Sequence, residues 1–384
     1  MSKKALITGI TATGAPRQTF LFHVGTPKTG TTSIQYALIR LSDDLKARGI
    51  HVPYDHTVYT PGFRIKDVPR GAPQTDGFAH FFDVRKRRPD LNLDWPQEVR
   101  TFLAEADAHT FVISHESMSQ QSYRLRDDLL APLAALADIR FLVYLRTPLS
   151  YLSSYCMQSI QGIGQVGPRR QDMQPVSHYL KGGYAGLLAP FENYGQVDAR
   201  NFDRLRQEGR LLPDFFAALG VDDMDEQIEA LENRNSSEPR LNLFCVLMAL
   251  KRNGIPGRKE WFDMRRRLRF AGRNLEGPMT TSFLSASVGE QVVARWDEDR
   301  EVLLERYGVS FDPITGFKPG PEVLSFSAEY AAALQDAAAP DLSDDQKDWL
   351  ADALTLADQD LEEVLPSQPK KPRHPKRRQK EILS

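Results

Sequence analysis

The feature that most constrains this chain is the stretch from Phe20 to Thr32, which reads FLFHVGTPKTGTT. Its first five residues form an apolar run with the length and composition of a β-strand. Gly25 and Gly30 then enclose a tight turn. The residues that follow have the apolar spacing of one helix face, at Ile34, Leu38, Leu41 and Leu45. We therefore expect a strand, a loop and a helix start in direct succession.

A loop of this kind forms a cradle for an anion. The loop amides and the first N–H groups of the helix point to one place, where the helix dipole favours negative charge. Lys28 adds a full positive charge, and the threonine hydroxyls add donors. The candidate binding residues are Thr26, Lys28, Thr29, Gly30, Thr31 and Thr32. We expect a phosphate or a similar oxyanion here.

The loop differs in one respect from the ATP/GTP P-loop, G-x-x-x-x-G-K-[ST], which is the nearest common pattern. Gly25 and Gly30 have the P-loop glycine spacing, and Thr32 stands at its hydroxyl position. Thr31 stands where the lysine should be, and the lysine lies earlier, at Lys28. A lysine within the loop indicates a different ligand geometry, which does not require a metal.

Further apolar runs predict the rest of a sheet. Residues 110–114 and 141–145 have strand character, a helix is expected over 129–137 between them, and another strand over 197–201. Continuous apolar runs are typical of parallel strands buried on both faces. Strands that alternate with helices favour an α/β fold. We therefore predict a central parallel sheet flanked by helices.

Polar side chains follow the first three strands. They are Lys28, then His115 and Glu116, then Arg146. In parallel sheets, ligands bind beyond the carboxyl ends of the strands. Arg146 offers a bidentate fork for a phosphate. Ser154, eight positions later in the next expected helix, adds a hydroxyl donor.

Two segments of this sequence resemble motifs of the sulfotransferases that use 3′-phosphoadenosine 5′-phosphosulfate (PAPS), of the bacterial and carbohydrate-type group. The P-K-T-G-T-T string at 27–32 resembles their 5′-phosphosulfate loop. The string that begins with Arg146 and runs through Ser154 to Tyr155 resembles the R-x-P-x(5)-S-x-Y block that holds the 3′-phosphate. The resemblance extends from about Phe20 to Leu219, and the remaining C-terminal part matches no family pattern.

The resemblance implies a P-loop-like fold and a sulfotransferase activity. A sulfuryl group would pass from PAPS, the co-substrate, to a hydroxyl or amine of a carbohydrate or small-molecule acceptor, with no metal. Lys28 would stabilise charge on the bridging oxygen of the leaving bisphosphate. The resemblance also implies a general base at the second strand end. His115 is similar in placement to the catalytic histidine of cytosolic sulfotransferases and is the favoured base. Bacterial relatives often carry a Ser-Ser-Glu at this point, which makes Glu116 the alternative.

Two alternatives from other classes remain open. One is a P-loop kinase that uses ATP and Mg²⁺, and the other is a non-catalytic nucleotide-binding protein. The displaced lysine, and the lack of an obvious Walker-B aspartate after a strand, argue against the kinase. A non-catalytic protein would keep Arg146 and Ser154 but would need no base.

The remaining segments suggest how the chain is organised. We expect a flexible leader over 1–18, a PAPS-binding α/β domain over 19–253, a mostly helical extension packing on it over 254–365, and a disordered, Pro-rich basic tail over 366–384. Helices are expected over 239–251, 288–307 and 344–365, the last with Ser343 as N-cap. The basic, aromatic stretch 259–273 either contacts an anionic partner or packs as an amphipathic helix. The tail is a candidate for peripheral contact with an anionic surface.

Composition excludes several classes. The 384 residues are 41% hydrophobic and 26% charged, which is ordinary for a soluble globular protein. A net charge of -2 gives no general attraction to nucleic acid. No apolar run approaches the roughly 20 residues that cross a bilayer. Cys156 and Cys245 have no metal-ligand spacing, so we expect free, buried thiols and a cytoplasmic location.

Overall fold

A computed structural model describes residues 17–26, 28–52, 107–115, 127–161, 169–229, 241–253, 257–272 and 282–364, with a few isolated residues between these ranges. Residues 1–16 of the predicted leader and the whole basic tail lie outside them. The last two leader residues are described: Arg17 donates to the carbonyl of Ala134 at 2.9 Å, and Gln18 donates to that of Ala108 at 2.9 Å. The chain forms two compact units that interleave in sequence. The first unit comprises 1–147, 184–235 and 299–312, and the second comprises 148–183, 236–298 and 313–384. The domains predicted from the sequence, in contrast, were continuous segments.

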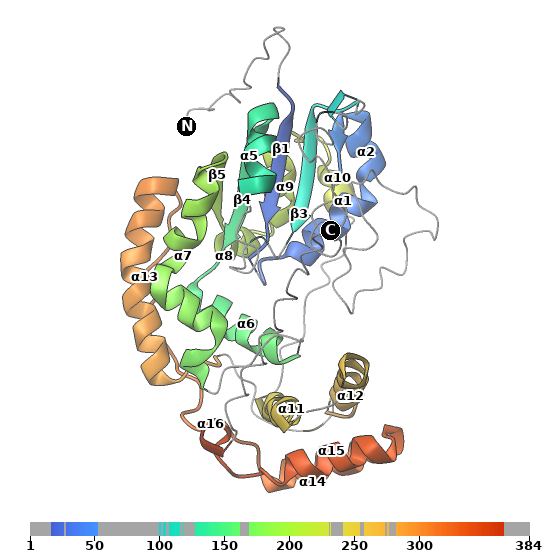
Figure 1. Ribbon diagram of the computed structural model, residues 1–384. Coiled ribbons are helices and arrows are strands. Elements are labelled where there is room, and N and C mark those ends of the chain that lie inside the picture. The colour runs from blue at the N-terminus through green and yellow to red at the C-terminus, as the bar shows by residue number, and fades with distance from the viewer. Residues whose placement is uncertain are drawn as a thin grey trace, which may run out of the picture. The chain divides into compact units, whose positions relative to one another are not determined.

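The first unit is built on a five-stranded parallel sheet with strand order β2-β3-β1-β4-β5 (Figure 1). Its strands are β1 (Thr19–Val24), β2 (Ile50–His51), β3 (Thr110–His115), β4 (Asp138–Leu145) and β5 (Gln196–Asn201). Helices lie on both faces of the sheet. The predicted α/β architecture, with a central parallel sheet flanked by helices, is therefore confirmed.

The apolar runs form central strands because both of their faces are buried. Side chains alternate between the two faces of a strand. On one face Phe20 stacks on Phe111, with ring centroids 4.7 Å apart, and Phe22 stacks on Phe141 at 5.5 Å. On the other face, residues such as Leu21 belong to a core that also contains residues of the flanking helices.

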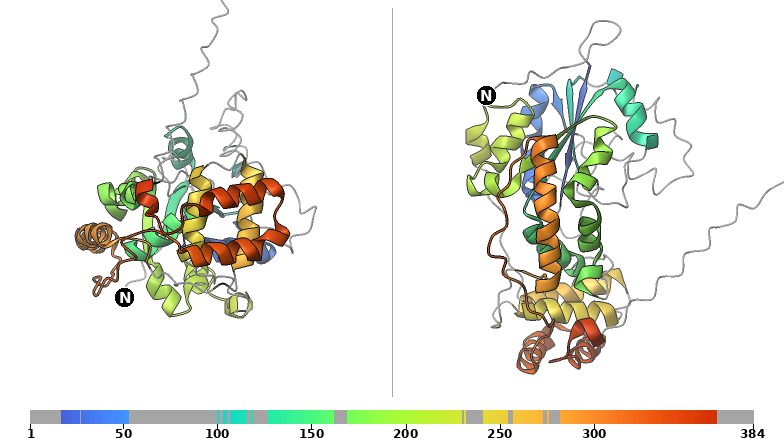
Figure 2. Two further views of the ribbon diagram at one scale, coloured as in Figure 1. Left: turned by 90° about the horizontal axis from the view of Figure 1, so that it is seen from below. Right: turned by 90° about the vertical axis from the view of Figure 1, so that its left-hand side faces the viewer.

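Five helices, α1, α2, α8, α9 and α10, contribute to that second core, and Figure 2 shows them on the opposite face of the sheet from α5. Their bounds are α1 (Thr31–Arg40), α2 (Ser42–Ala47), α5 (Asp127–Leu136), α8 (Phe202–Gln207), α9 (Leu211–Ala218) and α10 (Asp225–Glu229). The predicted apolar face of the first helix is buried, but the helix divides at Leu41 into α1 and α2.

The second unit is helical. Its elements are α6 (Pro148–Gln161), η3 (Arg170–Asp172), α11 (Leu241–Asn253), α12 (Arg258–Ala271), α14 (Ala328–Ala338), η5 (Ala339–Asp341), α15 (Asp344–Leu354) and α16 (Leu361–Val364). Two further helices, α7 (Gln174–Glu192) and α13 (Ala286–Tyr307), contribute residues to both units. Ser343 caps α15 as predicted, in a reciprocal capping box with Gln346. The helix predicted to reach residue 365 instead ends at Leu354, and α16 follows after a turn that contains Asp358 with φ of 59°.

The basic helix α12 packs on its neighbours with its apolar side. Trp261, Met264 and Leu268 are buried, and α12 contacts α11 and α14. Asp263 neutralises part of the basic side, because it accepts bonds from Arg266 at 2.6 Å and Arg267 at 2.7 Å. These contacts favour the packing alternative for this helix.

Two further expectations concern cysteines and membranes. Cys156 and Cys245 are both free and buried, as predicted. Among the described residues, no helix combines the length and the apolar character needed to cross a membrane.

His23 is a polar residue in the core of the first unit. It is fully buried between the rings of Tyr144 and Phe215, with centroids 5.6 and 5.5 Å away. Its Nδ1 lies 2.8 Å from the Ser114 hydroxyl. Burial lowers the pKa of His23 to about 3, so the ring is neutral in the folded protein.

We expect the free energy of unfolding to fall as the pH drops from about 6.5 toward 4. In this window the unfolded chain binds a proton at His23 that the folded protein does not, which costs up to about 1.4 kcal/mol per pH unit. His23→Gln should remove this component, so the stability gap between wild type and variant narrows as the pH falls. Urea denaturation across a pH series measures it. Ser114→Ala keeps the buried ring and should keep the wild-type slope; equal slopes in wild type and His23→Gln would contradict the expectation.

Candidate functional site

The topology of the sheet marks one place where a ligand is expected. β1 lies between β3 and β4. The chain leaves β1 toward β2 on one side, and it leaves β4 toward β5 on the other. The carboxyl ends of β1 and β4 therefore form a topological switch point, where open α/β sheets bind ligands. The register aligns these ends, because Val24 pairs with His115 on β3 and with Val143 on β4.

The loop after β1 has a backbone suited to an anion. Lys28 is exposed and has φ of 68°, and Gly30 has φ of 76°. Gly30 is the N-cap of α1 and supplies no side-chain bond to the helix. The first N–H groups of a helix have no intrahelical acceptors, so this helix start suits a bound anion. The positive φ angle at this position favours glycine, and a Cβ at Gly30 would also force the Leu211 side chain to shift, because it would lie 2.3 Å from Leu211 Cδ2.

Two of the predicted threonine ligands hold the loop itself. The Thr26 hydroxyl donates to the carbonyl of Tyr144 on β4 at 2.5 Å. The Thr29 hydroxyl donates to the Thr26 carbonyl at 2.6 Å. Both side chains are buried. Thr26 and Thr29 therefore fix the loop to β4 and close its turn, while Lys28 between them stays exposed.

Thr31 is different, because its hydroxyl is buried and finds no hydrogen-bond partner among the described residues. It is the first residue of α1. A buried polar group without a partner costs stability and calls for an explanation. A ligand at the helix start would supply one. Thr32 lies beside it in the first turn and is half-buried.

Arg146 follows β4 directly and reaches the loop after β1. Its Nη1 donates to the carbonyl of Lys28 at 3.4 Å. Its Nε lies 3.5 Å from Asp203 Oδ1, and the side chain is 13% exposed. Burial lowers the pKa of Arg146 while Asp203 opposes that shift, and the guanidinium stays charged. Both contacts are long, so this cation is held near the loop without strong bonds of its own.

Asp203 lies in the first turn of α8, directly after β5. Its Oδ2 accepts the backbone N–H of Thr147 at 2.7 Å. It therefore ties the residue after Arg146 to α8 and also provides a counter-charge for the guanidinium. Sequence reasoning missed it, although its position just beyond a strand end was a usable signal.

For the other predicted site residues, the structure gives at most a position in the fold. His115 is the last residue of β3, and the register puts its backbone at the same sheet edge as Val24. Glu116 lies outside the described residues. Ser154 lies on α6 of the second unit and is half-buried. The described residues thus bring together the loop after β1 and Arg146, while the general base and the Ser154 contact stay predictions.

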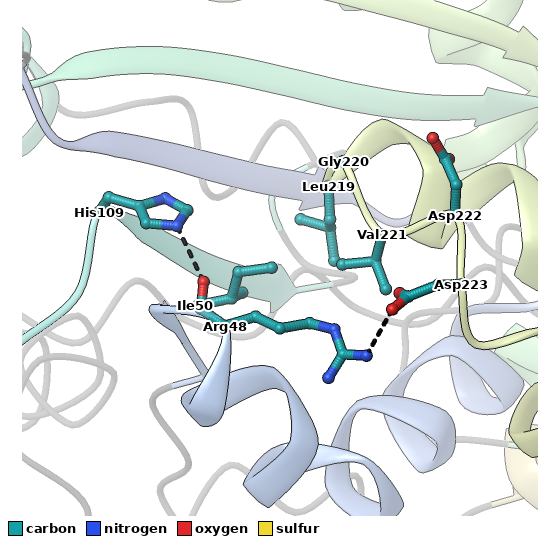
Figure 3. Close-up of a pocket in the computed structure, with 8 residues that line it drawn as sticks. All are labelled: Arg48, Ile50, His109, Leu219, Gly220, Val221, Asp222 and Asp223. Carbon is teal, nitrogen blue, oxygen red and sulfur yellow. Dashed lines mark hydrogen bonds and ion pairs between the residues drawn. The ribbon is translucent and has the colours of Figure 1, made fainter.

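A pocket of about 470 Å³ lies at the opposite, amino-terminal edge of the sheet (Figure 3). Two of its charged side chains are paired with each other. Arg48 and Asp223 form an ion pair at 2.9 Å, and His109 Nε2 lies 2.9 Å from the Arg48 carbonyl. These bonds tie α2 to the chain before β3 and after α9. We therefore regard the pocket as a structural junction, not as the functional site.

Neither a comparison with models of known protein families nor one with curated proteins finds a match to this chain. The residues and their geometry therefore carry the functional assignment.

Replacing Thr31 or Thr29 by valine should have different effects on the free energy of unfolding of the protein without ligand. Thr31→Val removes a hydroxyl that has no partner in the described part of the chain, so the free energy of unfolding should stay equal or rise by up to about 1 kcal/mol. Thr29→Val breaks a buried bond and strands the Thr26 carbonyl, so it should cost about 1–2 kcal/mol. Urea denaturation compares the two. A loss in Thr31→Val as large as that in Thr29→Val would contradict this view of the site.

Proposed function

We propose that this chain is a sulfotransferase that transfers a sulfuryl group from PAPS to a hydroxyl or amine of a carbohydrate or small molecule. The observation that carries the proposal is the contact of Arg146 with the Lys28 carbonyl at the switch point. It brings the guanidinium that follows β4 to the backbone of the loop after β1, the loop that also carries Lys28. Two cationic groups suit a ligand with two separate anionic groups, as in a 3′-phosphorylated, 5′-phosphosulfated nucleoside.

The first anion site is the loop after β1. We propose that β1, this loop and α1 form a P-loop-like unit whose amides and Thr31 hold the 5′-phosphosulfate. The residues fit that role, because α1 begins at a glycine without a capping side chain and at a hydroxyl without a described partner. Lys28 is exposed on the loop. Arg146 would bind the 3′-phosphate with its guanidinium fork.

The chemistry requires little from the protein beyond placement, charge and a base. The acceptor oxygen or nitrogen forms a bond to sulfur, and the bond from sulfur to the 5′-phosphate oxygen breaks. Lys28 and the loop amides stabilise the negative charge that builds up on that leaving oxygen. His115 or Glu116 takes the acceptor proton. 3′,5′-Adenosine bisphosphate leaves with the electron pair.

Asp203 would orient Arg146 while it binds. One carboxylate oxygen is occupied by the Thr147 N–H, so Asp203 stays in place whether or not a phosphate is present. A phosphate on the Nη atoms therefore does not need to displace it. We also propose a cytoplasmic location, supported by the two free, buried cysteines.

Calorimetric titration with 3′,5′-adenosine bisphosphate should show micromolar binding to the wild type, and ATP·Mg²⁺ should bind more weakly. Arg146→Ala should weaken bisphosphate binding by about 10- to 100-fold, since it removes charge-assisted bonds. Arg48→Ala is a matched control, because Arg48 also pairs with an aspartate but lies at the opposite sheet edge. It should bind as the wild type does.

Two outcomes would overturn the proposal. Preference for ATP·Mg²⁺ over the bisphosphate would make the P-loop kinase the better assignment. Equal effects of Arg146→Ala and Arg48→Ala would show that Arg146 contributes to folding and not to the anion site.

Turnover of PAPS with a panel of hydroxyl and amine acceptors tests the base. We expect His115→Ala or Glu116→Gln to lower turnover by about 10²- to 10⁴-fold, the usual contribution of a general base. The bisphosphate affinity should be retained, because neither residue is assigned to nucleotide binding. Full activity in both variants would place the base elsewhere. No turnover with any acceptor, despite bisphosphate binding, would favour a non-catalytic nucleotide-binding protein.

A further inference from the structure

We propose that Tyr184 is a positioning residue for Arg146, and that the buried carboxylate of Asp299 holds Tyr184 in place. The ligand that Arg146 receives rests on the proposed function, whereas the contacts do not. All three residues belong to the first unit. They come from three separate parts of the chain, namely the end of β4, the middle of α7 and α13.

The arrangement begins with a break in α7. Gly183 has φ of 59° and ψ of -165°, which is outside the helical region and accessible almost only to glycine. The helix therefore starts again at Tyr184. A helix start exposes backbone N–H groups that need acceptors, and here the acceptor comes from another helix.

Asp299 of α13 supplies that acceptor. Its two carboxylate oxygens accept the N–H groups of Tyr184 at 2.6 Å and Ala185 at 3.0 Å. Asp299 is fully buried, and a buried carboxylate is tolerated only with such partners. The helix dipole adds to the attraction. A second tie, the ion pair of Arg306 with Glu192, joins the later parts of the same two helices, which lie side by side in Figure 1.

Tyr184, held in this way by Asp299, in turn holds Arg146. Its side chain is buried, and its hydroxyl donates to the Arg146 carbonyl at 2.7 Å. This short bond holds the backbone at the point where the chain leaves β4. The contacts of the Arg146 side chain are longer, at 3.4 and 3.5 Å. The position of the guanidinium therefore depends strongly on its own backbone, which Tyr184 anchors.

The test is Tyr184→Phe, which removes only the hydroxyl. Tyr179→Phe is the matched control, because Tyr179 is also a buried tyrosine of α7. Two measurements apply to each variant. The first is the ¹⁵N–¹H signal of Arg146 Nε without nucleotide, identified by its loss in Arg146→Lys. The second is the calorimetric affinity for 3′,5′-adenosine bisphosphate.

In Tyr184→Phe we expect the Arg146 Nε signal to broaden and the bisphosphate affinity to fall about three- to tenfold, the effect of one hydrogen bond. Tyr179→Phe should change neither. An unchanged Nε signal in Tyr184→Phe, or an equal change in both variants, would overturn the positioning role. If the wild type binds no bisphosphate, the proposed function fails, while the nucleotide-free signal still decides whether Tyr184 positions Arg146.

Discussion

The hydrogen bond from the Thr26 hydroxyl to the Tyr144 carbonyl fixes the loop after β1 to strand β4. The rest of the candidate site depends on this tie. Because it joins the two strands at the switch point, it sets where Lys28 lies relative to the end of β4. Arg146 follows only two residues after Tyr144, so its guanidinium reaches the Lys28 carbonyl. A loop that could move away from β4 would separate the two cations that a doubly anionic ligand requires.

The same region contains polar groups that folding alone does not explain. Thr26 and Thr29 are bonded within the loop, yet the adjacent Thr31 hydroxyl is buried without a partner among the described residues. Among the described residues, the Arg146 guanidinium makes polar contacts at 3.4 and 3.5 Å and lies over the Phe202 ring at 5.7 Å, although its side chain is mostly buried. Both features cost stability in the protein without ligand. Their position at one switch point is the reason to connect them with binding, because such costs concentrate at functional sites.

Short local patterns in the sequence were enough to predict the central strands of the sheet. The runs at 20–24, 110–114 and 141–145 became central strands because nearly all of their residues are buried on one or the other face of the sheet. The threonine roles could not be predicted, since a loop sequence does not tell whether a hydroxyl faces a ligand or its own backbone. The contacts of Asp299 with Tyr184 and Ala185 join residues that are 115 and 114 positions apart. Periodic patterns in a sequence do not indicate contacts between residues so far apart. For the same reason the interleaved units were not foreseen.

For the proposed ligand, Arg146 is a more specific indication than the loop after β1. A glycine-flanked loop at a helix start binds many phosphorylated molecules, because backbone amides and a helix dipole recognise charge and little else. In the proposed function, the arginine at the end of the neighbouring strand β4 binds a second anionic group on the same ligand. Asp203 and Tyr184 restrain it from two directions, through the Thr147 N–H and the Arg146 carbonyl. Under this proposal, a triphosphate bound along the loop alone would leave Arg146 with its protein contacts to Asp203 and the Phe202 ring, whereas a ligand with a second anionic group would use its guanidinium.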